Sequence, residues 1–403
     1  MPRQRQLPAP SAHAARWPLD PDVVFLNHGS FGACPAAVLE RQRQLRLRLE
    51  RQPLRFFVRR LPALQDDALA TVAALVGAAP ADLAFVPNAT AGINTVLRSL
   101  KLSPGDQLLT TDHAYNACRN ALEFVARQQG AEVVVAEVPF PLASAEQARD
   151  AVLAAAGPRT RLALLDHVTS PTGLILPIHR MVRALQGRGV DVLVDGAHAP
   201  GMLPLDLSAL GAAYYTGNLH KWCCAPKGAA FLHARRDRQA DLRPLSISHG
   251  ASSPRTDRSR FQLEFSWTGT HDPTAYLSAP AALELLASLE PGGLEGLMAR
   301  NRALCLQARD LLCQALGLPA PCPDEMIGAL ASVPLPPGHA EVFDATATDP
   351  LQDALRQQHQ IEVQVYPWPP PAGRLLRVSA QAYNSVEQYA YLAEALKEQG
   401  VRG

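Results

Sequence analysis

Short apolar runs alternate with longer amphipathic stretches between about residues 80 and 235. The runs contain β-branched residues and are bounded by Gly, Pro or Asp, which is typical of buried strands. The expected strands are 82–86, 106–111, 131–138, 161–168, 190–195, 212–217 and 228–234. Helical stretches such as 89–100 and 115–129 fall between them. This alternation predicts an α/β fold with a mostly parallel, doubly wound sheet.

The pattern changes after about residue 270. Residues 273–316 predict one long helix, a Pro-Gly-Gly break and a second helix, and further strands and a final helix follow. A chain of 403 residues is too long for one ordinary core. We expect an N-terminal arm (1–30), a large domain (31–272) and a smaller C-terminal α+β domain (273–403).

One stretch, RQRQLRLRLERQPLRFFVRR (41–60), is locally basic. Leu45 and Leu49 recur at helical spacing, and Pro53 interrupts the pattern, so we predict an amphipathic helix with a solvated basic face. A nucleic-acid patch is the alternative. We expect the PLRFF end to lie near a subunit contact.

Composition narrows the possible partners and compartments. The net charge is +1, so no overall field favours nucleic acid or membrane, and we expect neither as a partner. No run of 18 apolar residues predicts a transmembrane helix, and the first residues lack the apolar core of a secretion signal. Seven cysteines without CxxC or zinc-ligand spacing indicate a reducing cytoplasm and no metal site.

In doubly wound sheets ligands bind at the carboxyl ends of the strands. Asn88, Ala89 and Thr90 lie between a strand and a helix, where backbone N–H groups and the helix dipole attract an anion. The alternative there is a plain helix cap by Asn88 or Thr90. His113 follows another strand, with Tyr115 beside it, although a lone histidine is more often structural than catalytic.

The later strands also end in polar residues. Asp195 ends one strand, three residues before His198; its carboxylate could bind a metal, cap a helix or pair with a cationic ring nitrogen. No HExxH or comparable ligand set accompanies it, which argues against a metal. Ser170 follows a fourth strand, and Lys221 stands in the apolar tract TGNLHKWCCAPKGAAFL. Lysine is rarely buried, so a surface turn is the alternative there.

These groups together suit pyridoxal 5′-phosphate. P-loop, GxGxxG and GxSxG patterns are absent. The cofactor needs a helix N-terminus for its phosphate, a flat group against its ring, a carboxylate for its ring nitrogen and a lysine for a Schiff base. Lys221 is then buried because it is covalently occupied.

The sequence resembles the class V aminotransferase family of fold-type I pyridoxal-phosphate enzymes, and within it isopenicillin N epimerase-like and hercynylcysteine sulfoxide lyase-like proteins. The resemblance runs from FLNHGSFGACP (25–35) to LLRVSAQAYNSVEQYAYLAEAL (375–396). NATAGIN, DHAYNA, VDGAHAPG, NLHKW, SWTGTHDP and LRVSAQAYN carry it in combination. It implies a large, doubly wound cofactor-binding domain and a smaller C-terminal domain.

The resemblance also implies roles around the cofactor ring. Lys221 forms the Schiff base, Asp195 pairs with the pyridinium nitrogen, and His113 stacks on the ring. Ser170 and His198 match positions that face the phenolic oxygen.

Further positions match the phosphate site, and they are Ala89 (through its N–H), Thr90, Asn218 and His220. Thr270 in SWTGTHDP matches a phosphate contact that the partner subunit supplies. A homodimer with shared active sites is therefore implied.

On the substrate side, Arg377 matches the clamp for the α-carboxylate, the alternative being an ordinary strand arginine, and Asn27 is expected to border the substrate. The family acts at Cα of an amino acid through an external aldimine and a carbanion. Epimerisation needs a second acid or base on the opposite face, for which Tyr115 is a candidate and His271 another.

The chain departs from cysteine desulfurases, which carry a nucleophilic cysteine shortly before the carboxylate-binding arginine. The corresponding stretch, IEVQVYPWPPPAGRLLR, has none. Cys118, Cys223 and Cys224 are expected to pack in the core. We expect epimerisation, with C–S β-elimination of cysteine or a cysteine conjugate, transamination and an inactive scaffold as alternatives.

Overall fold

The computed structural model describes residues 6–337, 348–369 and 373–401. Its large sheet has the order β2-β8-β7-β6-β5-β3-β4. The strands are β2 (Leu83–Val86), β3 (Gln107–Thr111), β4 (Glu132–Ala136), β5 (Thr160–Asp166), β6 (Asp191–Asp195), β7 (Tyr214–Asn218) and β8 (Ala230–Ala234). Strands β7, β6, β5, β3 and β4 are parallel to one another, and β8 is antiparallel to both β2 and β7. The predicted α/β fold with a mostly parallel sheet is confirmed.

Helices cover both faces of this sheet because alternate strand residues are apolar on each face. Leu164 and Leu193 pack with one set of helices, and Leu165 and Val194 with the other. The first set is α5 (Ala89–Ser99), α6 (Asn116–Gln129) and α10 (Arg260–Phe265). The second set is α4 (Leu61–Val76), α7 (Ala145–Ala155) and α8 (Ile178–Gln186). Short helices in the connections are η3 (Pro80–Asp82), α9 (Leu207–Leu210), η4 (Arg236–Arg238) and η5 (His249–Ser252).

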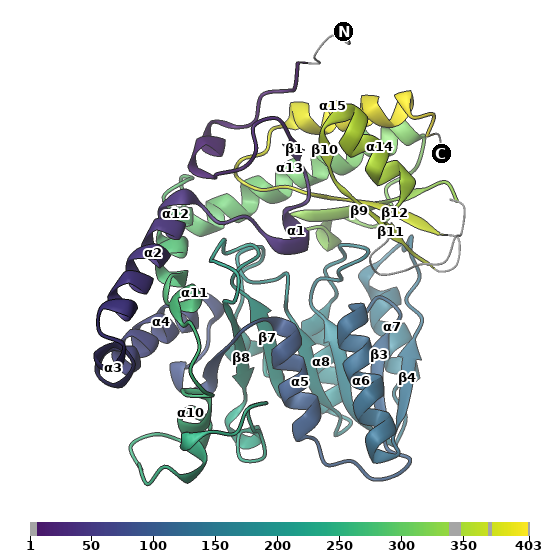
Figure 1. The fold of residues 1–403 in the computed structure, drawn as a ribbon. Helices are drawn as coiled ribbons and strands as arrows, with labels where there is room; N and C mark the ends of the chain where they lie inside the picture. The colour runs from purple at the N-terminus through teal and green to yellow at the C-terminus, as the bar shows by residue number, and fades with distance from the viewer. Residues whose placement is uncertain (1–5, 338–347, 370–372, 402–403) are drawn as a thin grey trace.

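A smaller antiparallel sheet, β11-β12-β9, lies above the large one in Figure 1. Its part of the chain comprises α11 (Thr274–Leu277), α12 (Ala279–Ala287), α13 (Gly293–Leu316), η6 (Asp324–Met326), β9 (Leu330–Leu335), α14 (Pro350–His359), β10 (Ile361–Glu362), β11 (Gln364–Pro367), β12 (Arg374–Ser379) and α15 (Val386–Glu398). The prediction of one continuous helix before the Pro-Gly-Gly break is wrong, because two helices, α11 and α12, stand there. Ser278 separates α11 from α12, and Pro280 stands in the first turn of α12, where its missing N–H is tolerated.

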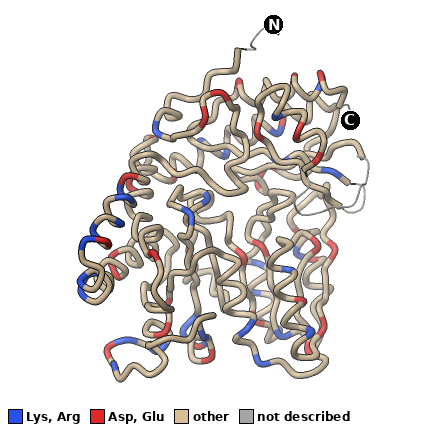
Figure 2. The backbone as a smooth tube through the Cα atoms, viewed as in Figure 1, with Lys and Arg blue, Asp and Glu red and all other residues tan. Residues whose placement is uncertain are grey.

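The N-terminal segment joins both parts of the molecule. It contains η1 (Ala12–Arg16), β1 (Val24–Phe25), α1 (His28–Phe31), α2 (Ala36–Arg51), α3 (Pro53–Arg55) and the π-helical turn η2 (Phe56–Arg60). Strand β1 pairs with β10, and α1 lies between the two sheets in Figure 1. The predicted basic amphipathic helix corresponds to α2, which buries Leu45 and Leu49, and its arginines are visible along one side in Figure 2.

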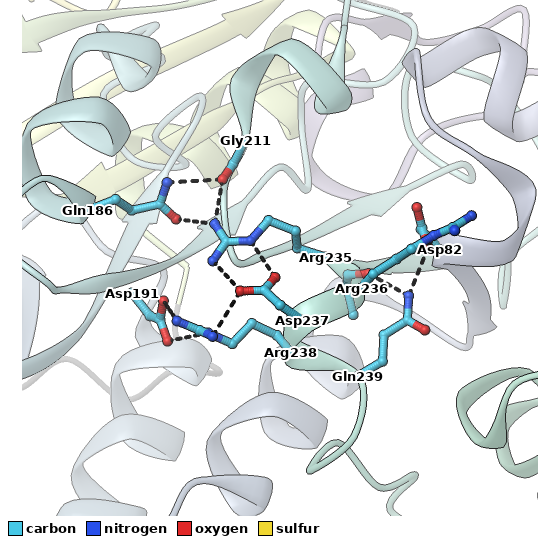
Figure 3. Close-up of polar contacts among 10 residues, drawn as sticks. Asp82, Gln186, Asp191, Gly211, Arg235, Arg236, Asp237, Arg238 and Gln239 are labelled. Carbon is cyan, nitrogen blue, oxygen red and sulfur yellow. Dashed lines mark hydrogen bonds and ion pairs between the residues drawn. The ribbon is translucent and has the colours of Figure 1, made fainter.

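A polar network holds the strand starts opposite the carboxyl ends (Figure 3). Arg238 makes a two-pronged contact with Asp191, at 2.8 and 3.0 Å, at the start of β6. Arg235 donates to the Gly211 carbonyl and to Gln186, so the residues after β8 are tied to the end of α8 and to the turn before β7.

No described helix is long and apolar enough to cross a membrane. Within the same residues, no group of three or more His, Cys, Asp or Glu side chains could hold a metal ion.

Candidate active site

The predicted site residues meet where β5, β6 and β7 end. Asp166 and Asp195 are register partners at the last residues of β5 and β6, and Asp195 is paired with Thr216 of β7. Asn218 ends β7, and its Oδ1 accepts the Ala89 N–H of α5 at 2.8 Å. Parallel strands therefore bring the residues of separate motifs to one edge of the sheet.

Lys221 stands in the tight turn that follows β7. Its Nζ lies 3.0 Å from His198 Nε2. Burial, followed by the charge of Arg377, lowers the pKa of Lys221 from 10.5 to about 8. The turn closes through the Cys224 N–H on the Lys221 carbonyl, and Cys224 has a positive φ of 54°, a strained conformation for a residue with a side chain.

The indole of Trp222 fixes the tautomer of His198. Its Nε1–H donates to His198 Nδ1 at 3.3 Å, which requires a lone pair on that nitrogen. Burial and neighbouring cations hold the pKa of His198 well below its usual value, so the ring is neutral and carries its proton on Nε2. That proton can only be donated to an unprotonated Lys221 amine. Sequence reasoning missed Trp222, although it follows the lysine directly.

Asp195 is 4% exposed, and both of its carboxylate oxygens accept hydrogen bonds. Oδ1 accepts the Ala197 N–H at 2.9 Å, and Oδ2 accepts the Cys118 thiol at 3.3 Å. Burial raises the pKa of Asp195, whereas these donors and the Lys221 charge oppose the rise. Asp166 lies beside it, and burial together with the Asp195 charge raises its pKa well above the usual range. Asp166 was missed, yet it ends its strand as Asp195 does.

The ring of His113 is fixed on all sides. Nε2 donates to the Val138 carbonyl at 2.8 Å, so Nδ1 accepts from the Thr172 hydroxyl at 2.7 Å. The indole of Trp368 meets the imidazole edge to face, with centroids 4.5 Å apart. His113 is therefore a buried, neutral ring whose orientation is fixed.

The start of α5 is pressed against the sheet. Asn88 caps the helix by accepting the Ala91 N–H at 2.8 Å, as the helix-cap alternative expected. A Cβ on Gly92 would lie 2.3 Å from Thr216 Oγ1, so only glycine allows this approach. Thr90 is half-buried in the same first turn.

Two other predicted phosphate contacts differ in their surroundings. His220 Nδ1 donates to the Ala229 carbonyl at 2.9 Å, which leaves a lone pair on Nε2, and burial lowers the His220 pKa to about 4. Thr270 is exposed, and in the described part of the chain no hydrogen bond joins it to the other predicted site residues. His271, beside it, is also exposed.

Arg377 reaches the site from β12 and is 1% exposed. Its Nη1 donates to the Ser170 carbonyl at 2.6 Å and to Ser170 Oγ at 3.2 Å. Its Nη2 donates to Ser30 Oγ at 2.8 Å, and Ser30 in turn donates to Asn27 Oδ1 at 2.6 Å. The Tyr366 ring covers the guanidinium at 4.6 Å. Nε is buried without a partner, which leaves a donor for a ligand.

Tyr115 is the most open of the predicted site residues at this edge, with 44% of its surface exposed. Desolvation of its hydroxyl raises the Tyr115 pKa, and Tyr366, Cys118 and Asp195 add to the rise. The hydroxyl therefore remains protonated at neutral pH. Tyr366 and Ser30 were missed because neither stands in a pattern that marks a strand end.

Comparison with known proteins gives four consistent matches. A family profile for aminotransferase class-V matches residues 55–349. An isopenicillin N epimerase of Streptomyces clavuligerus is 38% identical over 392 residues, covering 94% of this chain and 95% of the relative. A probable chloroplastic L-cysteine desulfhydrase of Arabidopsis thaliana is 34% identical over 403 residues, covering 94% and 83%. The solved cystine C–S lyase C-DES, in complex with cysteine persulfide, has a TM-score of 0.75 at 22% identity and covers 93% and 97%.

Proposed function

The chain belongs to the aminotransferase class V family and is an enzyme that depends on pyridoxal phosphate, and from that premise we propose that it epimerises an amino-acid substrate at Cα. The observation that carries the proposal is the partly buried Lys221, whose amine lies 3.0 Å from His198 Nε2 and has its pKa lowered to about 8, in the site that also holds the buried carboxylate of Asp195. A lysine in this state can exchange a proton near neutral pH.

The described residues fit the cofactor. Lys221 would hold it covalently, the Asp195 carboxylate would meet its ring nitrogen, and His113 would stack on its ring. The start of α5, brought close by Gly92, would hold the phosphate with Asn218. Asp195, His113 and Asn218 are buried, and hydrogen bonds to neighbouring groups fix their orientation.

Bound pyridoxal phosphate supplies an electron sink for the pair released when a bond to Cα breaks. Asp195 would keep the ring nitrogen protonated, which would deepen that sink. Arg377 would hold the substrate carboxylate, with its unpartnered Nε as one of the donors. Lys221 would take the proton from Cα, and the protonated hydroxyl of Tyr115 would return one to the opposite face.

Epimerisation is supported by the extent of similarity to the Streptomyces clavuligerus epimerase and by the lack of cysteine in 361–377. The second candidate is a C–S β-lyase acting on cysteine or a cysteine conjugate. It is favoured by the similarity to the Arabidopsis thaliana desulfhydrase. Both reactions begin with loss of the same proton, and they differ in whether the substrate carries a β-sulfur leaving group.

We also propose a homodimer with shared active sites and a cytoplasmic location. The exposed apolar residues of 31–58 support the dimer, since such patches mark interfaces. The exposed Thr270 on the loop beside them would complete the partner's phosphate site. All seven cysteines are buried and free, which supports a reducing compartment.

The test is a screen of L- and D-amino acids and cysteine conjugates in deuterium oxide. We expect deuterium at Cα with inversion and without pyruvate. Pyruvate and a released thiol or sulfide would identify the lyase instead. Borohydride should reduce a covalent link between cofactor and protein in the wild type but not in Lys221→Ala. A link that persists in Lys221→Ala would reject the assignment of the lysine.

A further inference from the structure

We propose that the segment Asn27–Ser30 is a positioning element that fixes Lys221 relative to Arg377, with His28 acting on the lysine and Ser30 on the arginine. The inference rests on the proposed function, because it concerns the two groups that would handle the substrate's Cα proton and carboxylate. Lys221 follows β7 of the large sheet, and Arg377 is on β12 of the small sheet. Segment α1 lies between the two sheets (Figure 1).

His28 joins the small sheet's side of the molecule to the lysine turn. Its Nδ1 accepts the Ala33 N–H at 3.3 Å and the Tyr383 hydroxyl at 2.9 Å, so its proton is on Nε2. Nε2 donates to the Lys221 carbonyl at 3.0 Å, and the nearby Gln381 amide donates to Cys224 Sγ. The ring is fully buried, and burial lowers the His28 pKa to about 3, which keeps this neutral tautomer.

Ser30 performs the corresponding task for the arginine. Its hydroxyl donates to Asn27 Oδ1 at 2.6 Å, so its lone pairs are directed at Arg377 Nη2, 2.8 Å away. Nη1 is held separately by Ser170. The guanidinium is thereby fixed at both ends, and the orientation of its remaining donor is set.

The backbone near these side chains packs closely against both the small sheet and the lysine turn. The Gly29 N–H donates to Ser379 Oγ at 2.9 Å, and a Cβ on Gly29 would lie 2.8 Å from Leu330 Cδ1. Gly32 has a φ of 71°, and a Cβ there would lie 2.1 Å from the His220 carbonyl oxygen. The chain contacts β12 at Gly29, within the segment, and packs closely on the residue before Lys221 at Gly32, just after it, so a displacement on one side is transmitted to the other.

The placement of Lys221 relative to Arg377 matters because the rate of proton transfer depends steeply on geometry. An error of about 1 Å in the placement of a reacting group costs on the order of 100-fold in rate. The lysine must meet Cα while the arginine holds the carboxylate attached to the same carbon. Loss of the His28 contact should therefore lower kcat, whereas loss of the Ser30 contact should raise KM.

The experiment compares His28→Leu, His28→Gln, Ser30→Ala and the double variant His28→Leu/Ser30→Ala, using the substrate found in the deuterium screen. We expect His28→Leu to lower kcat roughly 10- to 100-fold with little change in KM, and Ser30→Ala to raise KM about 5- to 10-fold. His28→Gln, which retains an amide donor, should recover part of kcat. In the double variant, the fold-loss of kcat/KM should be smaller than the product of the two single fold-losses, because losing either anchor already loosens the segment.

A second readout needs no substrate. The rate at which apo-protein forms the borohydride-reducible link with pyridoxal phosphate should fall in His28→Leu and remain unchanged in Ser30→Ala. His233→Asn is the matched control, since it removes a buried histidine of β8 that contacts neither Lys221 nor Arg377. Unchanged kcat and link formation in a folded His28→Leu, or multiplicative losses in the double variant, would overturn the inference. A link that forms in Lys221→Ala would instead refute the proposed function.

Discussion

At the residue scale, the chemistry of Lys221 is set by neighbours that stand close to it in sequence or in space. Burial disfavours the ammonium ion, and the Trp222 N–H fixes the tautomer in which His198 donates to a neutral amine. The sequence predicts both Lys221 and His198, because each follows a strand end. It does not reveal that the two side chains lie 3.0 Å apart, with Trp222 behind the imidazole.

Trp222→Phe removes the N–H while keeping an aromatic ring. Nδ1 of His198 can then carry the proton, so donation to the neutral amine is no longer enforced, and the Lys221 pKa should rise above about 8. Reductive ¹³C-methylation of the apo-protein, followed by NMR titration of the labelled amine, measures this. Trp267→Phe is the control, since Trp267 packs on Phe57 instead. An unchanged Lys221 titration would show that the tautomer has no influence.

Arg377→Lys tests the carboxylate clamp. A lysine offers one point charge in place of a planar fork, and it cannot keep both the Ser170 and Ser30 contacts while binding a carboxylate. Loss of about 2–4 kcal/mol corresponds to roughly 30- to 1000-fold in kcat/KM. Steady-state kinetics measure the loss, and the cofactor absorbance should persist. Unchanged kcat/KM, or loss of the cofactor absorbance, would contradict the role.

At the element scale, the contact between α5 and β7 decides where a phosphate would lie. Gly92 faces Thr216 so closely that the first turn of α5, with Ala89 and Thr90, rests on the strand end. The sequence predicts the helix and its polar start, because the apolar spacing and Asn88 mark them. It cannot predict the helix-to-sheet distance, which depends on a side chain more than a hundred positions away.

Gly92→Ala places a methyl group 2.3 Å from Thr216 Oγ1, so α5 must move outwards. Replacing a glycine by alanine inside a helix usually stabilises the helix by about 1 kcal/mol. Weaker cofactor binding in this variant would therefore come from the clash with Thr216 and not from helix propensity. Overpacking of roughly 1–3 kcal/mol should raise the dissociation constant for pyridoxal phosphate about 5- to 100-fold. Fluorescence titration of the apo-protein measures it. Gly157→Ala is the control, because its Cβ would lie 3.4 Å from the nearest atom, Gln107 Oε1, which is an ordinary contact. Equal affinities would disprove the argument.

The ends of the strands of the large sheet were predictable to within two residues. Short apolar runs that are bounded by Gly, Pro and Asp and alternate with helical stretches have few structural interpretations other than strands. The contacts of Arg377 were not predictable, since Ser170 and Ser30 stand 207 and 347 positions away. The domain boundaries stay predictions. Strand β1 of the expected arm pairs with β10 of the expected small domain, so chain order does not separate the two.

At the scale of the whole molecule, buried histidines link stability to pH. The residues whose pKa values are lowered by burial are His28, His113, His167, His198, His220 and His233. In the unfolded chain each takes up a proton at its ordinary pKa of 6.5. In the folded chain the pKa is about 3 for His28 and about 4 for His167, His220 and His233. The unfolded state therefore binds more protons in this window, and stability falls as pH drops. Asp166 and Asp195, with raised pKa values, oppose the trend but are outnumbered.

We expect the free energy of unfolding to be largest above pH 6.5 and to fall steadily towards pH 4. A histidine whose pKa falls from 6.5 to about 4 contributes up to roughly 3 kcal/mol to this loss. Urea unfolding of the apo-protein at several pH values measures the slope. His233→Asn removes one titrating group far from the site and should flatten it. A slope of the opposite sign would show that the carboxyl groups dominate.

The proposed dimer accounts for an unusual concentration of exposed apolar residues. Five large hydrophobic residues stand out from the surface between residues 31 and 58, and they are Phe31, Leu39, Leu47, Leu54 and Val58. Phe57, within the same stretch, packs on Trp267 at 5.5 Å, and Arg46 pairs with Asp272 at 2.7 Å. The loop that carries Thr270 therefore borders this patch, and a second copy docked there would receive it.

Leu54 and Val58 are 78% and 58% exposed, so charging them should not disturb the folded subunit but should oppose burial in an interface. We expect the double variant Leu54→Asp/Val58→Asp to sediment as a monomer and to bind pyridoxal phosphate more weakly, because the partner's Thr270 is lost. Val386→Asp is the control, since that valine is 36% exposed at the start of α15, where an acidic residue suits the helix. Thr270→Ala should weaken cofactor binding without changing the mass. A monomeric double variant with wild-type cofactor affinity and activity would contradict shared sites, because each subunit would then be complete by itself.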